Sequence, residues 1–202
     1  MAERKEISAR ARAVFAKKSL VRLTAAKKAG IHPEYLRRQV KSGRLIRVER
    51  GIYSLPGAPV TENHSLALAA QMAPNGVICL LSALRFHNIT TQLPRQVWMA
   101  LKAGSRQPRS GVLGLEFIRM SGRSFSQGVE EHVIEGVRVR VYNPAKTVAD
   151  CFKFRNKVGL DVALEALKEG RHSRRFTADE IVHYARINRV QKVMMPYMEA
   201  IF

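Results

Sequence analysis

The chain opens with a helical period of apolar and polar positions. Over residues 4–18, apolar side chains recur on one stripe of a helix, and basic side chains occupy the opposite side. Such a pattern predicts an amphipathic first helix that packs across the elements after it. The apolar stripe comprises Ile7, Ala11, Val14 and Phe15.

A short second helix is predicted over residues 25–29. Thr24 precedes it and suits the N-cap position, because a threonine hydroxyl can accept from the free N–H groups of the first turn. Gly30 follows at the position where helices usually end, since glycine enters the left-handed region without a Cβ clash. The segment therefore predicts one tight, capped helix.

A third helix is predicted from Pro33 to Ser42. Proline suits a first helical position, where its missing N–H is no loss. Leu36 and Val40 lie four residues apart and are expected to be buried, and Gly43 ends the helix. Two helices joined by a glycine-containing turn predict a helix-turn-helix, whose second helix can enter a major groove.

A hairpin is expected directly after Gly43. Strand-forming residues over 45–48 and 52–55 flank the turn Glu49-Arg50-Gly51. A hairpin at this place is the wing of a winged helix, and its tip carries Arg47 and Arg50. The alternative is a small helical pair with an unrelated hairpin and a solvated basic face; the order and short spacing of the elements favour the winged helix.

A proline- and glycine-rich stretch, residues 55–59, is the candidate boundary between a winged helix-turn-helix domain, residues 1–58, and a C-terminal domain, residues 59–202. The second domain mixes β-type and helical patterns, so the fold class is α+β, with a small sheet flanked by helices. Strands are expected over residues 96–101, 115–120, 132–134 and 137–142. Helices are expected over residues 63–72, 82–87, 160–169 (ended by Gly170), 178–187 (opened by a capping box of Thr177 and Glu180) and 193–202 (beginning near Pro196). Asn143-Pro144 begins another helix by its cap and proline, and Glu135-Gly136 makes the turn before the last strand.

The excess of basic residues indicates a polyanionic partner. The 202 residues hold 35 Lys or Arg against 16 Asp or Glu, a formal net charge of +19. Residues 1–58 hold 15 of the basic and four of the acidic residues, which gives them +11 and leaves +8 for the other 144. Such an excess attracts polyanions, of which nucleic acid is the commonest in a cytosol.

Localisation follows from what the sequence lacks. Cys79 and Cys151 lie far apart in apolar surroundings and are expected to be buried thiols. The N-terminus is charged from Glu3 onward, without an apolar signal-type segment, and no stretch approaches the roughly 18 apolar residues of a membrane span. We therefore expect a cytoplasmic protein without membrane contact.

Catalytic and cofactor motifs are not evident. No phosphate-binding glycine motif occurs, and the scattered histidines pair with no cysteine, so no cofactor or metal site is predicted. Ser82, His87 and Asp150 can be drawn as a nucleophile–base set, but nothing local marks it, and Ser82 reads better as a helix cap. Asp150 can act as a metal ligand or base; an ion pair with Lys146, four residues earlier, is the favoured interpretation.

Candidate DNA contacts concentrate on the third helix and the hairpin. Arg37, Arg38 and Gln39 carry side chains able to read base edges. Arg47 and Arg50 are expected to bind phosphate or the minor groove. The remaining candidates are Tyr35, Lys41 and Ser42 for phosphates or a thymine methyl. A second basic loop, equally interpretable as a solvated loop, carries Lys102, Arg106 and Arg109.

Three segments together resemble a known family. These are KSGRLIRVERGIYSLPG, then ICLLSALRFHNITTQLP, where Ser82, Ala83, Leu84 and His87 fit an S-A-L-x-x-H pattern, and VYNPAKTVADCFKFRNKVGLDVALEAL. Their order resembles that of AbiEi-type antitoxins of bacterial type IV toxin–antitoxin systems, which act in abortive infection, a phage defence. The resemblance extends to about residue 170; residues 172–202 match less clearly.

The resemblance implies a function beyond generic DNA binding. Proteins of this family have a winged-helix half that represses their own operon by binding inverted repeats, sometimes cooperatively, which allows dimerisation on DNA. Their C-terminal half counters a nucleotidyltransferase-like toxin encoded beside the antitoxin. The family supplies no catalytic residue that maps onto this chain.

Two other functions remain open at the level of sequence. One is an enzyme whose C-terminal domain is localised by a nucleic-acid-binding module; the isolated acids Asp150, Asp161 and Asp179 disfavour it, because phosphoryl or nucleotidyl chemistry needs a paired acidic motif. The other is a general RNA- or DNA-binding protein that uses the same basic surface. We expect a repressor and antitoxin without enzymatic activity.

Overall fold

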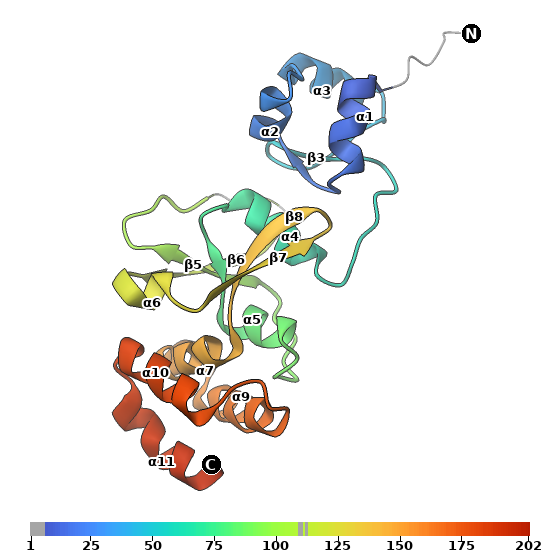
Figure 1. Ribbon diagram of the computed structural model, residues 1–202. Coiled ribbons are helices and arrows are strands. Elements are labelled where there is room, and N and C mark those ends of the chain that lie inside the picture. The colour runs from blue at the N-terminus through green and yellow to red at the C-terminus, as the bar shows by residue number, and fades with distance from the viewer. Residues whose placement is uncertain (1–6, 109–110, 112) are drawn as a thin grey trace, which may run out of the picture.

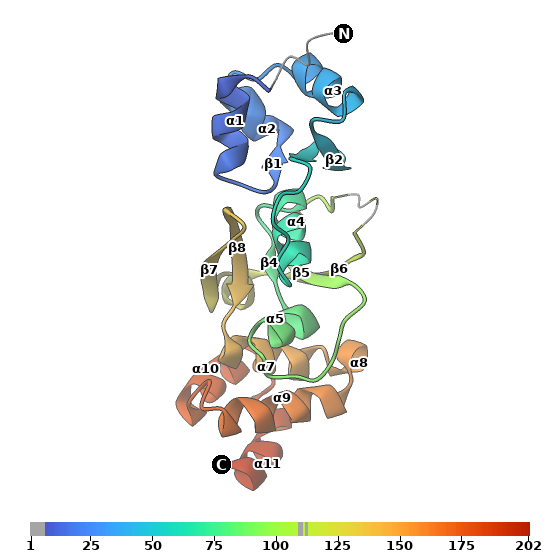
Figure 2. The ribbon, with the colours of Figure 1, turned by 90° about the vertical axis from the view of Figure 1, so that its right-hand side faces the viewer.

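The computed structural model describes residues 7–108, 111 and 113–202. The chain is laid out along one axis. Its N-terminal elements form one end, a five-stranded sheet lies in the middle, and the C-terminal helices form the other end (Figures 1 and 2). Residues 4–6 of the predicted first helix lie outside the described residues.

Short helices and a three-stranded antiparallel sheet form the N-terminal end. Strand β3 lies between β1 and β2, and β2 and β3 form the predicted hairpin. The elements are α1 (Ala9–Ala16), β1 (Val21–Arg22), α2 (Leu23–Lys28), α3 (Pro33–Lys41), β2 (Ile46–Glu49) and β3 (Ile52–Ser54). They share a hydrophobic cluster of Ala11, Phe15, Val21, Ala26, Ile31, Leu36, Leu45 and Tyr53.

The starts of α2 and α3 differ in how they are capped. The expected cap at Thr24 is wrong: α2 begins at Leu23, whose N–H donates to the carbonyl of Gly51 at 2.7 Å. Pairing of β1 with β3 therefore leads the chain directly into the helix, and Thr24 lies exposed in its first turn. The predicted end at Gly30 is confirmed by a φ of +74°. Helix α3 begins at Pro33, as predicted.

A mixed sheet forms the centre of the molecule, with strand order β6-β5-β4-β8-β7. Strand β4 is antiparallel to β5 and parallel to β8, β6 is parallel to β5, and β7 is antiparallel to β8. The strands are β4 (Val77–Ile78), β5 (Val97–Lys102), β6 (Leu115–Met120), β7 (Val129–Ile134) and β8 (Val137–Tyr142). The predicted strands are confirmed, with β7 three residues longer at its start.

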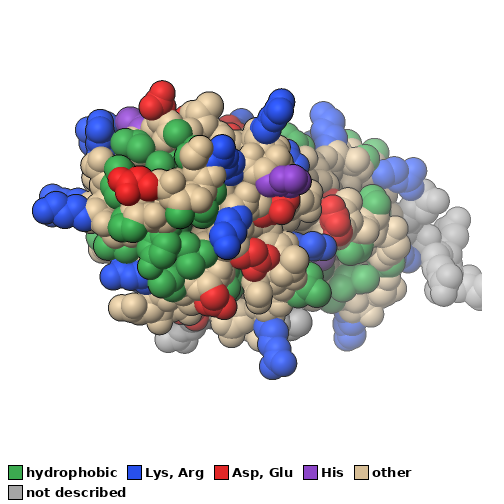
Figure 3. Space-filling model, turned by 90° about the horizontal axis from the view of Figure 1, so that it is seen from below, with side chains coloured by type: hydrophobic (Ala, Val, Ile, Leu, Met, Phe, Trp, Pro, Cys, Tyr) green, Lys and Arg blue, Asp and Glu red, His purple; other side chains and the backbone are tan. Residues whose placement is uncertain are grey.

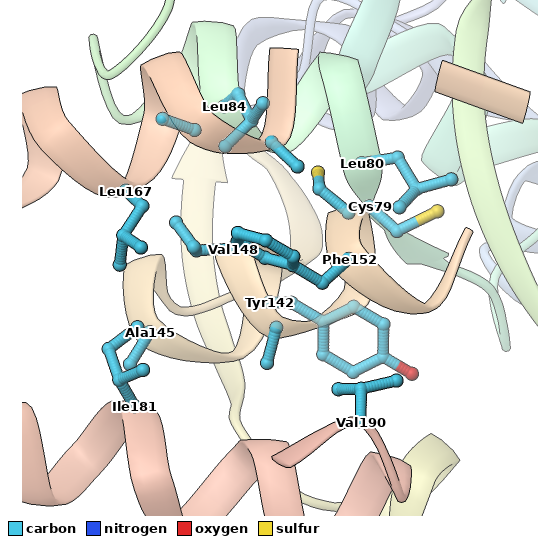
Figure 4. Packing of buried hydrophobic residues seen from close by; sticks show 14 of the residues in the cluster. Cys79, Leu80, Leu84, Tyr142, Ala145, Val148, Phe152, Leu167, Ile181 and Val190 are labelled. Atoms are coloured by element: carbon cyan, nitrogen blue, oxygen red, sulfur yellow. The ribbon is translucent and has the colours of Figure 1, made fainter. Parts of the chain in front are cut away.

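Helices cover both faces of this sheet. Helix α4 packs on one face against Ile78, Met99 and Val141. The other face is covered by the cluster drawn in Figure 4, in which Tyr142 and Phe152 lie among side chains of α5, α9 and α10. The helices are α4 (His64–Met72), α5 (Leu80–Phe86), α6 (Gly122–Ser126), α7 (Pro144–Lys153), α8 (Arg155–Val158), α9 (Leu160–His172), α10 (Ala178–Asn188) and α11 (Gln191–Ile201).

Local capping explains two of these helices. The Asn143 side chain accepts from the N–H of Lys146 at 2.8 Å and begins α7. Thr177 and Glu180 form the predicted capping box at the start of α10. Residues 55–63, which contain the predicted boundary, form neither helix nor strand; the division after residue 58 stays a prediction. Within the described residues, no helix is long and apolar enough to cross a membrane.

Three helix boundaries differ from the prediction. Ser82 is not a cap: α5 begins at Leu80, and the Ser82 hydroxyl accepts from the N–H of Trp98 at 2.9 Å. Gly170 does not end α9, which continues to His172. The glycine is needed for packing, because a Cβ there would overlap the ring of Phe176. Helix α11 begins at Gln191 and contains Pro196 in its interior.

Candidate nucleic-acid interface

A hollow of about 620 Å³ lies between α3 and the β2–β3 hairpin. It brings together four of the predicted DNA-contacting side chains, two from the helix and two from the hairpin: Arg37, Lys41, Arg47 and Arg50. No acidic residue is found among the described residues that line it. Four cations around one hollow create a positive potential that attracts phosphate oxygens.

The outer face of α3 is polar and charged. Burial of Leu36 turns Glu34, Arg38 and Lys41 to solvent, as the helical period predicts. Arg37 lies toward the hairpin and pairs with Glu34 at 3.2 Å, an ion pair whose side chains are 75% and 58% exposed. Because this pair is exposed, it holds the guanidinium only weakly and leaves it able to bind a nucleic acid.

Gln39 cannot be a base-reading residue in this conformation. It lies one turn from Leu36 on the inner face of α3 and is only 8% exposed. Its Oε1 is buried without a hydrogen-bond partner. The identity of the side chain suggested adenine recognition, but its rotation about the helix axis places it in the core.

Tyr35 and Ser42 take partly structural positions. The Tyr35 hydroxyl accepts from the N–H of Ser8 at 2.7 Å and ties α3 to the start of α1. The Ser42 hydroxyl donates to the carbonyl of Gln39 at 3.1 Å at the end of α3, where the residue remains exposed. Of the two, Ser42 is the more accessible to DNA.

The predicted second basic loop meets the hairpin. Arg106 and Arg50 line one cleft of about 740 Å³, together with Arg22. Lys102 is exposed at the end of β5, and Arg109 lies outside the described residues. The structure thus places the described tip of the loop beside the cationic hairpin.

Glu49 holds this loop in place, a role that sequence reasoning missed. The residue was expected in the hairpin turn, but it ends β2 and is only 7% exposed. Its carboxylate accepts from the N–H groups of Gly111 at 3.3 Å and Leu113 at 3.2 Å. These partners are more than sixty residues away, so no local pattern announces the contact.

The opposite end of the molecule has a different surface. Viewed from the C-terminal helices, Lys and Arg side chains stand apart and mix with acidic and apolar ones (Figure 3). On this face the basic side chains do not gather as they do around the hollow beside α3.

The residues considered for catalysis do not come together. His87 Nε2 lies 2.8 Å from the carbonyl of Tyr142, and burial lowers the pKa of His87. Ser82 contacts the main chain of β5, as described above. Asp150 instead pairs with Lys146, as predicted, in a salt bridge whose side chains are both fully buried. Burial raises the pKa of Asp150, and the ammonium of Lys146 opposes that shift.

The two cysteines are buried free thiols, as expected. Burial raises the pKa of Cys79 and of Cys151 above the ordinary value, which disfavours the reactive thiolate. Among the described residues, no group of three or more His, Cys, Asp or Glu side chains is placed to hold a metal ion.

The N-terminal elements match a known protein family in sequence. Residues 10–56, which span α1 to β3, match the family described as a transcriptional regulator, AbiEi antitoxin. Residues 10–56, which we call the AbiEi segment, are therefore similar to this antitoxin family. The AbiEi segment contains every described side chain of the hollow between α3 and the hairpin. The family match ends before residue 59, so the resemblance of the later segments stays a prediction.

A solved structure is similar over most of the chain. The crystal structure of the RV2827C protein from Mycobacterium tuberculosis matches with a TM-score of 0.58 at 13% sequence identity. The match covers 89% of this chain and 72% of that one. At this identity the likeness shows a shared fold over most of the chain and nothing about function. None of the curated proteins compared with the chain is significantly similar to it in sequence.

Proposed function

We propose that this protein is a DNA-binding transcriptional repressor of its own promoter and the antitoxin of a type IV toxin–antitoxin system. The observation that carries the proposal is the acid-free hollow between α3 and the hairpin, where Arg37, Lys41, Arg47 and Arg50 converge. It lies within residues 10–56, which match a family of regulators. The basic charge of the hollow, its position between helix and hairpin and the family match therefore all support DNA binding at this surface.

The order of elements supports a winged helix-turn-helix. Helices α2 and α3 are joined by a short turn at Gly30, and the β2–β3 hairpin follows α3 directly. In such a module the second helix lies in the major groove and the hairpin lies beside it. Helix α3 then presents Arg38 to base edges and Lys41 to phosphates, since both are exposed on its outer face.

The hairpin and the second basic loop contribute phosphate contacts. Arg47 lies in β2 and Arg50 in the hairpin turn, and Glu49 holds the adjoining loop, whose Arg106 lines the same cleft as Arg50. A protein carrying these cations along one side can follow the duplex backbone beyond the groove that α3 occupies. This contribution is independent of base sequence.

The remaining helices and sheet are the proposed antitoxin part. We infer that residues 59–202 counter a nucleotidyltransferase-like toxin, by direct contact or through its effects, and that the chain itself is not an enzyme. Inverted repeats in the promoter would seat two copies on the DNA.

A reporter assay in cells tests this function. The DNA upstream of the gene is fused to a reporter, and repression is compared for the wild type, Arg38→Ala and Lys168→Ala. Lys168 is exposed on α9, at the end of the molecule away from α3, so its loss removes one charge without touching the interface. We expect repression by the wild type and Lys168→Ala and relief by Arg38→Ala. Equal repression by all three proteins would overturn the role of α3.

Co-expression tests the antitoxin half. The adjacent gene product is produced alone, with the wild type and with Arg38→Ala. Rescue of growth by both antitoxin proteins is expected, because Arg38 lies outside the proposed antitoxin part. Growth arrest that neither protein relieves would exclude antitoxin activity.

A further inference from the structure

A second basic hollow lies far from α3, between α6, the end of α7 and the end of α10. It has a volume of about 920 Å³. We call it the α6–α10 pocket; its basic lining residues are Arg123, Lys153, His183, Arg186 and Arg189. No acidic side chain occurs among the described residues that line it. Figure 1 shows α6 and α10 beside the lower part of the sheet, separated from α3 by the sheet itself.

The cations of this pocket lack carboxylate partners. No ion pair in the described part of the chain joins Arg123, Lys153, Arg186 or Arg189 to an acid. Where they hydrogen-bond, the partners are neutral: Lys153 Nζ donates to the Ser124 hydroxyl, and Arg186 Nε donates to the side-chain carbonyl of Gln191, both at 3.4 Å. Four like charges at one hollow repel one another, so a bound anion would stabilise the arrangement.

Lys153 is partly buried at this pocket, and one other pocket cation, Arg189, acts on its pKa. Burial lowers the pKa of Lys153, and the nearby charges of Lys146 and Arg189 lower it further, although Asp150 opposes them. A polyanion in the pocket would reverse this balance, because a negative charge close to an ammonium favours its protonated form.

A buried polar network fixes the wall of the pocket. The Ser124 hydroxyl donates to Asn188 Oδ1 at 2.9 Å, and Asn188 Nδ2 donates to Asp150 at 2.7 Å. Asn188 is only 4% exposed, and Asp150 also pairs with the fully buried Lys146. Each side chain of this hydrogen-bond network is held by the next. Ser124 and the ammonium of Lys153 that donates to it are therefore positioned before any ligand binds.

The backbone conformation at the end of α10 positions another cation of the pocket, Arg189. Arg189 ends α10 in the left-handed conformation, with φ +59° and ψ +35°. A non-glycine residue in this region is uncommon. Arg189 lines the pocket together with Arg186 of α10 and Arg123 of α6, so guanidinium groups from separate elements share one hollow.

We propose that the α6–α10 pocket binds the polyphosphate group of a small ligand, a nucleoside di- or triphosphate or pyrophosphate. A guanidinium matches a phosphate with two parallel hydrogen bonds. One phosphate monoester carries about −1.5 to −2 charges at pH 7, so four cations match two or more linked phosphates better than one. The volume lies within the roughly 300–1,000 Å³ of small-molecule sites. The site is additional to the proposed DNA interface.

Calorimetric titration of the full chain tests this site. The probes are pyrophosphate, ATP, GTP, inorganic phosphate and adenosine, each at fixed ionic strength. The proteins are the wild type, Arg186→Ala, Lys153→Met, Lys168→Ala and Arg38→Ala. Arg186 is exposed, and methionine keeps the apolar stem of Lys153, so the two pocket variants should fold; circular dichroism confirms it.

We expect pyrophosphate or a nucleotide to bind the wild type at least about tenfold more tightly than phosphate. Each pocket variant should weaken this binding by about tenfold or more, as expected for the loss of a charge-assisted contact. Lys168→Ala and Arg38→Ala should bind like the wild type. Tightest binding of pyrophosphate would assign the site to the phosphates alone, and tighter binding of a nucleotide would add its base or sugar.

Several results would overturn the proposal. Absence of binding, or adenosine binding as tightly as ATP, would exclude phosphate recognition. Equal weakening by Lys168→Ala or Arg38→Ala would show nonspecific attraction to the net positive charge. Displacement of the probe by duplex DNA from the wild type but not from Arg38→Ala would place the probe at the α3 surface. By contrast, weaker operator binding by Arg38→Ala with pyrophosphate binding intact would support two separate sites.

Discussion

The main-chain N–H of Ser19 donates to the carbonyl oxygen of Glu135 at 3.0 Å. This bond joins the loop after α1 to the turn between β7 and β8, residues 116 positions apart in the sequence. The Glu135 side chain accepts from the N–H of Thr61 at 2.7 Å and lies 2.8 Å from His64 Nδ1. One turn of the sheet therefore contacts the N-terminal part, the linking segment and the start of α4.

Gly136→Ala should weaken this contact. Gly136 has a φ of +75°, and a Cβ would overlap the carbonyl oxygen of Lys17. Gly104→Ala is a matched control, because Gly104 has a φ of +81° with nothing within 4 Å of a Cβ. Both variants carry a left-handed penalty of about 1–2 kcal/mol, so the excess loss in Gly136→Ala reports the contact. Thermal unfolding measures it, and equal losses in the two variants would contradict the contact.

Glu135→Gln should destabilise the protein in a pH-dependent way. Burial alone would raise the pKa of Glu135, but hydrogen bonds from Thr61 and His64 outweigh it and lower the pKa below its usual 4.5. A lowered folded-state pKa stabilises the protein above the unfolded pKa, and this stabilisation is lost as pH falls through the folded one. At neutral pH the free energy of unfolding of the wild type should exceed that of Glu135→Gln by about 1–2 kcal/mol.

Urea unfolding of both proteins between pH 7 and pH 3 measures this effect. The difference in unfolding free energy should shrink once the pH falls below 4.5, the ordinary glutamate pKa. A difference that stays constant through this range would show that the carboxylate charge contributes nothing.

The buried pair of Lys146 and Asp150 should behave as a unit. Asp150→Asn keeps an acceptor for Asn188 but leaves the Lys146 ammonium buried without a counter-ion, at a cost of about 3–5 kcal/mol. Adding Lys146→Met removes that charge and should restore most of the loss. A double-mutant cycle by urea unfolding measures the coupling. Further destabilisation by the second substitution would refute this interpretation.

Arg50→Ala and Arg38→Ala should separate affinity from specificity. Arg50 in the hairpin turn is expected to bind phosphate, so its loss should weaken all DNA alike and lower the salt slope by about one. Arg38 on the outer face of α3 is expected to read bases, so its loss should cost about 1–3 kcal/mol on the operator alone. Titrations with operator and random duplexes distinguish them, and equal losses on both DNAs from Arg38→Ala would refute base reading.

The sequence predicted those parts of the fold that local patterns determine. The Asn143 and Thr177 caps, the left-handed Gly30 and the turn at Glu135-Gly136 depend on neighbours within a few residues. Gly170 was misjudged because its reason lies in tertiary packing. An isolated glycine near a helix end indicates a stop, whereas here the ring of Phe176 requires the missing Cβ.

The sequence predicted which basic residues the candidate interface contains, but not which way each side chain of α3 points. Basic residues on α3 and the hairpin were visible, yet Gln39 is turned inward beside Leu36. The spacing of Leu36 and Gln39, three residues apart, could have indicated this. Glu49 could not have been found, since its partners Gly111 and Leu113 belong to a distant loop. Spacing likewise predicted the Lys146–Asp150 pair but not its burial.

Sequence-specific DNA binding through α3 and the hairpin is the central claim. Fluorescence anisotropy of the full chain, with the DNA upstream of its gene against a scrambled duplex over a salt series, tests it most directly. The account predicts at least about a thousandfold preference for the upstream DNA at physiological salt, with a salt slope that reports the number of phosphate contacts. Equal binding to both duplexes that disappears as salt rises would show that the net charge of +19 only attracts polyanions, and would contradict it.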